Sequence, residues 1–326
     1  VFLGYSLFLF GFLIPHSQII YTLTAISLVW CFFVRPIKID RSWLVILLIT
    51  TGFFIFLYNS VWRQDSSGIS LAIRGVWGDW GNHLGLPLYY QSVNHSTLAN
   101  PFVSGSNFTY TLLPSLLTSI PLHLGASIRF SILLFGISWS VSAVIFLIYL
   151  GQLLGLKRLS LLVPLLFYLN GNLGFIHAVS DIQPQPIGQF LSHIPREYGH
   201  FWEEGYHLGN FLDFFFVSQR SFVLGLPLGL AILILVFSSS KKQDLLIPAI
   251  LLGLLPFIHV HSFIAILVIF LAYSTFHLQS IWILSILLAL PYFNWLKFFN
   301  SSLASGFLIY KLGWLSGTEN WIWFWI

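Results

Sequence analysis

Residues 128–150, IRFSILLFGISWSVSAVIFLIYL, decide the fold class, because this apolar stretch carries a single charge, Arg129, near its beginning. A helix needs roughly 20 mostly apolar residues to cross a hydrocarbon core of about 30 Å. Each charge near the bilayer centre costs about 2.5–3.5 kcal/mol. The stretch therefore predicts a transmembrane helix.

The composition extends this prediction to the whole chain. Of its 326 residues, 57% are hydrophobic, 18% aromatic and 7% charged, and the mean hydropathy is +0.86. A soluble domain carries about a quarter charged residues, so a water-soluble enzyme, a disordered chain and a fibrous repeat are excluded. The one cysteine, Cys31, excludes a disulfide framework and a thiolate metal cluster. The net charge of +4 comes from scattered basic residues, so we expect no nucleic-acid partner.

Further apolar stretches of similar character are bounded by charges, so we predict an all-α, polytopic bundle of transmembrane helices in one domain, 1–326. Because the sequence begins at Val1 without Met and ends in an apolar run, we expect a fragment of a longer protein. The predicted spans are Val1–Ile14, Ile19–Val34, Trp43–Tyr58, Ile128–Leu150, Leu159–Phe175, Ser221–Phe237, Leu245–Ile258, Ser262–Phe276 and Ile281–Trp295.

Basic residues predict the orientation, because short cytoplasmic loops are rich in Lys and Arg. They gather in three connections, which hold Arg35, Lys38 and Arg41, then Lys157 and Arg158, then Lys241 and Lys242. Two long polar segments, 59–126 and 171–220, then lie on the extracytoplasmic side and contain short surface or re-entrant helices. This placement of the loops on two sides requires that Tyr110–Leu124 does not cross the membrane. Leu245–Tyr273 is either a hairpin that turns at His259 and His261 or one long tilted span.

The first outer segment contains a candidate site at Asp79, Trp80 and His83. In a helix, Asp79 and His83 are four residues apart on one face, where a carboxylate orients an imidazole or both address one ligand. An indole beside a carboxylate suits a carbohydrate. The alternative is an interfacial aromatic belt with a solvated Asp.

The second outer segment contains Asp181 and a cluster at helical spacing, Glu203, Glu204 and His207. A Glu three residues before a His is a pattern found in metal sites, although one copy also suits a polar loop at the headgroups. Arg220 stands just before an apolar span, where a guanidinium can pair with a lipid phosphate or simply snorkel.

The pair His259 and His261 lies within an apolar run. Polar groups at membrane depth usually face a cavity or a partner. These two side chains are therefore either hydrogen-bonded structural histidines or part of a binding site.

Together, these features resemble the GT-C superfamily of membrane glycosyltransferases, which use polyprenyl-phosphate sugars as donors. The resemblance covers roughly residues 43–296, with 1–42 as extra N-terminal spans and 297–326 as an outer loop and the start of a further span. It rests on a span followed by a loop that carries Gly78, Asp79 and Trp80, on the stretch 100–110, and on a non-spanning helix before Arg129. The run from Gln219 to Phe222 is similar to uncharacterised prokaryotic members.

The resemblance implies an inverting transfer from a lipid-linked sugar to a glycan, lipid or protein acceptor, at the extracytoplasmic face of a prokaryotic plasma membrane. It implies catalytic roles for Asp79 and Asp181, and a donor-phosphate role for Arg220. His83, one helical turn after Asp79, is a further candidate catalytic residue. Gln219, Trp80, Glu203, Glu204, His259 and His261 are the other candidate substrate-binding residues. A divalent cation, Mg²⁺ or Mn²⁺, would have Asp79, Asp181 and His207 as candidate ligands. The alternatives are a multi-pass transporter, a polymerase or ligase of lipid-linked polysaccharide, or a non-catalytic scaffold.

Overall fold

The structure is a computed structural model. It describes residues 2–31, 41–65, 68–71, 79–97, 99–107, 111–170, 175–184, 186–192, 198, 212, 219–239, 241–276 and 280–299. Their regular structure is helical, as predicted, with one addition: β1 (Trp62–Asp65) and β2 (Gly68–Leu71) form an antiparallel hairpin.

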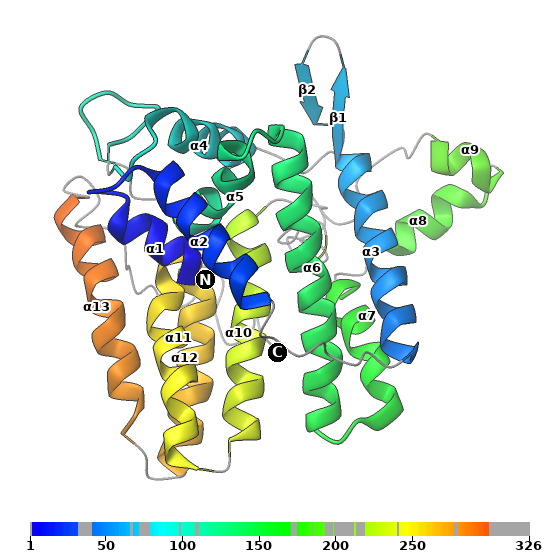
Figure 1. Ribbon diagram of the computed structural model, residues 1–326. Helices are drawn as coiled ribbons and strands as arrows, with labels where there is room; N and C mark the ends of the chain where they lie inside the picture. The colour runs from blue at the N-terminus through cyan, green and yellow to red at the C-terminus, as the bar shows by residue number, and fades with distance from the viewer. Residues whose placement is uncertain are drawn as a thin grey trace, which may run out of the picture. The chain divides into compact units, whose positions relative to one another are not determined.

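The helices follow the chain in the order labelled in Figure 1. They are α1 (Phe2–Phe10), α2 (His16–Cys31), α3 (Arg41–Val61), α4 (Asp79–Val93), α5 (Leu113–His123), α6 (Ile128–Leu153), η1 (Lys157–Leu162), α7 (Val163–Tyr168), α8 (Phe175–Ile182), α9 (Ile187–Ser192), α10 (Arg220–Ser238), η4 (Lys242–Leu245), α11 (Leu246–Leu254), η5 (Leu255–Phe257), α12 (Val260–Phe276) and α13 (Trp282–Phe299), where η denotes a 3₁₀ helix.

Contacts divide the chain into two compact units. The larger comprises residues 1–97 and 110–289, which include α1 to α12. The smaller comprises 98–109 and 290–326. In its described part, the Asn100 side-chain oxygen accepts hydrogen bonds from the N–H groups of Phe102 and Val103, which closes a turn.

Three helices of the larger unit, α3, α6 and α10, are long and apolar enough to span a membrane. Ser127 caps α6 by accepting a hydrogen bond from the N–H of Phe130. At that end, Arg129 donates to Asn59 near the end of α3, with 2.8 Å between the nitrogen and oxygen atoms. The two helices are therefore antiparallel.

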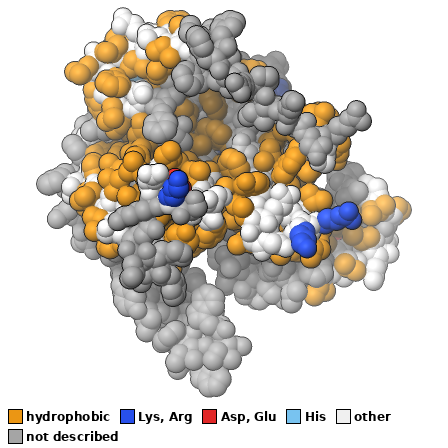
Figure 2. All heavy atoms as spheres, turned by 60° about the horizontal axis from the view of Figure 1, so that its bottom comes forward, with side chains coloured by type: hydrophobic (Ala, Val, Ile, Leu, Met, Phe, Trp, Pro, Cys, Tyr) orange, Lys and Arg blue, Asp and Glu red, His pale blue; other side chains and the backbone are white. Residues whose placement is uncertain are grey.

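The buried core of these helices is hydrophobic. It includes Phe54 and Tyr58 from α3, Val144 and Leu147 from α6, and Val223 from α10. In contrast, only 11% of the span in α3 is buried. A contiguous exposed apolar surface marks contact with a membrane or a partner, and Figure 2 shows such a surface with few basic side chains. These features indicate an integral membrane protein.

The structure resolves the two alternatives for Leu245–Tyr273 in favour of the hairpin. The helical segment that contains α11 ends at Phe257, and α12 begins at Val260. α12 then runs beside α10 in the same direction, because Gly225 faces His259 and Gly229 faces Ile266. Both segments are apolar but shorter than the three long helices.

Two shorter segments differ in how well they match the sequence prediction. α5 has 11 residues, or roughly 16 Å at 1.5 Å per residue, so it is too short to cross a bilayer, as predicted. The predicted continuous span Leu159–Phe175 is wrong. The chain there forms η1 and then α7, because Pro164 lacks a backbone N–H and restarts the helix at its first turn.

The ends of the long helices differ in charge. α6 and α10 finish at the same end of the unit in Figure 1, where Lys157 and Lys241 follow them and are exposed. The opposite end, where α10 begins, is covered by α4 and α5, which pack against each other and against α6. The basic connections and the start of α10 are therefore separated by the length of the helices.

Candidate functional site

Arg220 is the first residue of α10, and its side chain is only 4% exposed. Gln219 precedes it with a non-helical backbone and makes no side-chain cap. The apolar residues that follow make α10 a candidate span, so the sequence puts a guanidinium at the boundary of a membrane-length helix. Packing of α10 against α6 and α5 then buries it.

Polar and aromatic side chains surround the guanidinium. Arg220 donates to the hydroxyl of Thr118 on α5, with 2.8 Å between the atoms. Its central carbon lies 5.5 Å from the ring centroid of Trp139 on α6, within range of a cation–π interaction. Tyr58 on α3 lies close enough to interact with it electrostatically. We call Arg220 and its neighbours Tyr58, Trp80, His83, Thr118 and Trp139 the Arg220 cluster.

The neighbouring hydroxyls are oriented by the backbone. Thr118 donates to the carbonyl of Pro114 at 2.7 Å, so its oxygen accepts from Arg220. Ser140 donates to the carbonyl of Gly136 at 2.6 Å, so Tyr58 donates to Ser140. The hydroxyls of Thr118 and Ser140 thus each donate a hydrogen bond to the backbone and accept one from a side chain.

Arg220 forms no ion pair with a carboxylate in the part of the chain that the structure describes. An isolated charge in an apolar interior is costly, and such charges normally have a partner. Thr118 and Trp139 supply a dipole and a ring quadrupole but no negative charge. The arrangement is therefore suited to bind an anion.

The cluster also includes Trp80 and His83 of the motif predicted in the first outer segment. Asp79 is the first residue of α4, and His83 follows one turn later. His83 accepts a long hydrogen bond, 3.5 Å, from the backbone N–H of Arg220, one of the donors that a helix start leaves without an intrahelical partner. His83 therefore lies beside Arg220, and a shared role of Asp79 and His83 stays a prediction.

Trp80 is 1% exposed and packs edge-on against His83, with 5.5 Å between ring centroids. Stacking of a sugar on Trp80 stays a prediction that requires the cluster to open.

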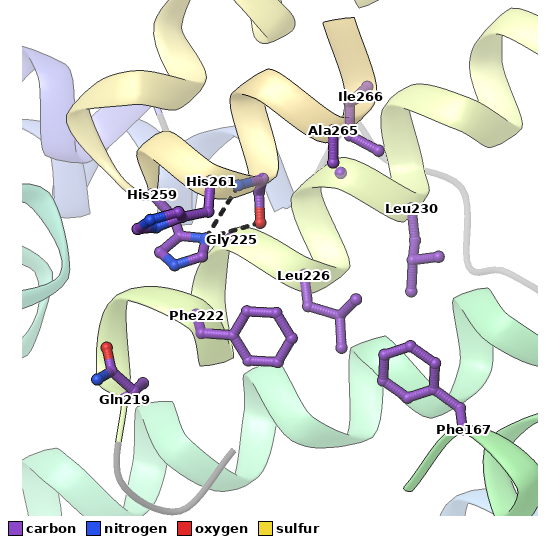
Figure 3. A pocket seen from close by; sticks show the side chains of 12 residues that line it. Phe167, Gln219, Phe222, Gly225, Leu226, Leu230, His259, His261, Ala265 and Ile266 are labelled. Atoms are coloured by element: carbon purple, nitrogen blue, oxygen red, sulfur yellow. Dashed lines mark hydrogen bonds between the residues drawn. The ribbon is translucent and has the colours of Figure 1, made fainter. Parts of the chain in front are cut away.

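A cavity of about 460 Å³ lies on the neighbouring face of α10, between α7, α10 and α12. Figure 3 shows its two kinds of lining. Gln219, His259 and His261 provide polar groups, and the rest is mostly apolar, including Phe167, Phe222, Leu226, Leu230 and Ile266. We call it the α10–α12 cavity.

This cavity brings together three residues selected from the sequence, Gln219, His259 and His261. Arg220 directly follows Gln219, but its side chain is on the adjoining face of α10 and does not line the cavity. The polar end of the cavity and the Arg220 cluster therefore lie next to each other along the chain, at the beginning of α10.

Asp181 is a further predicted residue that the structure describes. Asp181 lies on α8 and accepts a hydrogen bond from the Tyr198 hydroxyl at 2.8 Å, and its convergence with Arg220 stays a prediction. Glu203, Glu204 and His207 lie outside the described residues. Among the described residues, no group of three or more His, Cys, Asp or Glu could hold one metal ion.

Sequence reasoning missed Tyr58, Thr118 and Trp139. Thr118 and Trp139 lie within apolar helices and look like ordinary interior residues in the sequence. One signal was present: Tyr58 and Asn59 are polar residues at the end of a predicted span, the level at which binding groups gather.

Comparisons with known proteins add no assignment to these observations. No family model matches the chain, and no curated protein and no solved structure is significantly similar to it.

Proposed function

We propose that the protein is a GT-C-type membrane glycosyltransferase that transfers a sugar from a polyprenyl phosphate to an acceptor on the extracytoplasmic face. The observation that carries this proposal is Arg220, a buried guanidinium without a described carboxylate partner at the start of a membrane-length helix. A lipid phosphate supplies the missing negative charge, and a guanidinium matches its oxygens in a bidentate geometry.

The α10–α12 cavity supports the same class of substrate. A ligand pocket of about 300–1,000 Å³ is typically apolar with a few polar groups that fix orientation. The 460 Å³ cavity has this composition, and it suits the first part of a prenyl chain whose polar end lies near Gln219. The phosphate is then at the level of Arg220, and it reaches the guanidinium when the start of α10 moves away from α5.

The proposed reaction is a single displacement. The oxygen of the acceptor hydroxyl attacks the anomeric carbon, the bond from that carbon to the phosphate oxygen breaks, and the configuration inverts. Asp79 accepts the hydroxyl proton as general base. Arg220 stabilises the negative charge that the departing polyprenyl phosphate keeps.

The charges at the helix ends support the proposed orientation. Lys157 and Lys241 follow α6 and α10 at the end opposite the Arg220 cluster. By the positive-inside rule, that end is cytoplasmic. The Arg220 cluster is then extracytoplasmic, where lipid-linked sugars of this kind would be used.

Binding of farnesyl phosphate to the full chain in nanodiscs, measured by isothermal titration calorimetry, tests the anion site. Arg220→Met should weaken binding at least tenfold, since a charge-assisted bond contributes about 1.5–3 kcal/mol. Arg129→Met, at the same end of the neighbouring α6 but only partly buried and bonded to Asn59, should bind like the wild type. Equal affinity of the Arg220→Met variant and the wild type would refute the proposal.

Transfer from a radiolabelled panel of polyprenyl-phosphate sugars tests the catalytic role. Asp79→Asn should abolish transfer and retain farnesyl phosphate binding. In sealed proteoliposomes, a transporter would instead move the labelled lipid or sugar across the membrane without breaking its glycosidic bond. That outcome would replace the enzyme proposal.

A further inference from the structure

His259 is the residue that precedes α12, and its side chain caps that helix. Its Nδ1 atom lies 3.2 Å from the backbone nitrogen of Ser262 and 2.8 Å from the Ser262 hydroxyl oxygen. Ser262 is the third residue of α12, whose N–H has no partner within the helix. The imidazole therefore takes the place that an Asn or Ser side chain usually occupies at a helix start.

These contacts determine where the ring carries its proton. A backbone N–H can only donate, so Nδ1 accepts that hydrogen bond and bears no hydrogen. In a neutral imidazole the single proton then resides on Nε2. A doubly protonated ring would lose the contact with the Ser262 N–H, so the cap favours the neutral form.

The other ring nitrogen, Nε2, can donate a hydrogen bond to a ligand in the cavity. His259 lines the α10–α12 cavity, and in the part of the chain that the structure describes its side chain makes no hydrogen bond other than those with Ser262. Figure 3 shows His259 and His261 on the α12 side, with Phe222 and Gln219 across from them. Nε2–H is thus a neutral donor beside an apolar volume.

Packing also keeps the ring in place. The Phe222 ring contacts it edge-on, with 5.5 Å between centroids. A Cβ atom at Gly225 would lie only 2.6 Å from the His259 Cβ, so α10 and α12 approach each other closely here. Because Gly225 packs against its Cβ atom and Ser262 binds its Nδ1, the His259 side chain has little freedom to rotate.

We propose that His259 is a ligand-binding residue that donates one hydrogen bond from Nε2–H to the head-group oxygen of a prenyl lipid in the α10–α12 cavity. The choice of a prenyl lipid rests on the proposed function. The contact needs no charge on the ligand, so it recognises the oxygen of a prenyl alcohol as well as that of a prenyl phosphate. The apolar lining strengthens this hydrogen bond relative to one in water.

This division of roles separates His259 from Arg220. Arg220 contributes affinity only for a charged head group, because its interaction is electrostatic. His259 contributes for charged and uncharged heads alike. The two residues can therefore be tested independently with farnesol and farnesyl phosphate.

The decisive variant is His259→Asn in the full chain in nanodiscs. Asn is among the best helix caps, and its side-chain oxygen can accept from the Ser262 N–H, so the fold is retained while the donor to the cavity is lost. Calorimetry should show binding of both farnesol and farnesyl phosphate about three- to tenfold weaker, the value of one neutral hydrogen bond. The thermal unfolding midpoint, measured in parallel, should stay near that of the wild type.

Ser262→Ala is the matched control. It removes the hydroxyl but keeps the backbone N–H that holds Nδ1, so binding of both probes should change less than in His259→Asn. If the His259→Asn variant binds both probes like the wild type, the inference about His259 is overturned. If it weakens farnesol binding while Arg220→Met leaves farnesyl phosphate binding unchanged, the inference stands and the proposed glycosyltransferase function fails.

Discussion

His16 is completely buried, and only one of its two ring nitrogens has a hydrogen-bond partner among the described residues. Ser96 donates its hydroxyl proton to the carbonyl of Leu7, so its oxygen accepts from the His16 Nε2–H at 3.0 Å. Nδ1 has no partner. Burial, together with a smaller effect of the nearby His123 ring, lowers the pKa of His16 to about 4. The native state therefore holds His16 neutral.

This residue makes stability dependent on pH. An unfolded His binds a proton near pH 6.5, whereas native His16 does so only near pH 4. Between these values the unfolded state binds more protons, so the free energy of unfolding falls as the pH falls. Thermal unfolding at a series of pH values should show a loss of about 1–3 kcal/mol between pH 6.5 and pH 4.

His16→Gln provides the comparison, because the Gln amide can still donate to Ser96 but does not titrate. The variant should lose less stability on acidification than the wild type. A wild type and a variant with the same pH dependence would contradict the assignment of this proton to His16.

Arg220 should lower the free energy of unfolding of the ligand-free protein, although it contributes to binding of the proposed lipid phosphate. Replacing a buried, unpaired charge by an apolar side chain of similar length is often neutral or stabilising. We expect Arg220→Met to raise the free energy of unfolding by about 1–3 kcal/mol in the absence of ligand. Thermal unfolding of ligand-free protein in detergent measures this, and marked destabilisation would show that Arg220 has a structural partner.

The sequence could identify Arg220 and His83 because charged residues are rare in this chain and their positions relative to the spans are readable. It could not identify Thr118 or Trp139. Their roles depend on α5 and α6 meeting at the start of α10, and Thr118 is 102 positions from Arg220 in the sequence. Asp181 illustrates the converse: its charge was visible in the sequence, but its described partner is Tyr198.

At the scale of elements, α10 and α12 are joined by glycine. A Cβ atom at Gly225 would meet His259, and one at Gly229 would meet the side chain of Ile266 at 3.2 Å. The absence of side chains at these two positions lets the helices approach closely. Small residues have this role in helix interfaces within membranes.

Gly225→Ala should therefore destabilise the protein by about 1–3 kcal/mol, the usual cost of overpacking. Gly52→Ala on α3 is the matched control, because an added methyl group there has no neighbour within 4 Å. That variant should be neutral or more stable by up to about 1 kcal/mol, the difference in helix propensity. Unfolding midpoints of both variants measure the effect, and equal responses would contradict the close approach of α10 and α12.

Hydrophobic runs were sufficient to predict α3, α6 and α10, since a long apolar stretch has few alternatives in a membrane protein. They were misleading for Leu159–Phe175, where Pro164 divides the run into η1 and α7. The hairpin of β1 and β2 was missed because each strand has only four residues. A run that short has no clear two-residue periodicity.

At the scale of the whole molecule, the larger unit has a basic end and an end that carries the Arg220 cluster. Cysteines introduced at Lys157 and Leu124, in a Cys31→Ser background, should react with a membrane-impermeant maleimide from opposite sides. Both positions are exposed and follow α6 and α5. We expect Leu124→Cys to react in intact cells and Lys157→Cys only after the membrane is opened. Labelling of both from one side would contradict the proposed topology.

The α11–α12 hairpin has a consequence for how the protein is made. Its two apolar segments, Gln243–Phe257 and Val260–Tyr273, are each shorter than the roughly 20 residues that cross a bilayer alone. Neither has enough hydrophobic length to leave the translocon singly, so we expect them to enter the lipid together, after the ribosome has finished both. Packing against α10, which is synthesised first, would then complete their insertion. The α10–α12 cavity would therefore form only after all three helices are in the membrane.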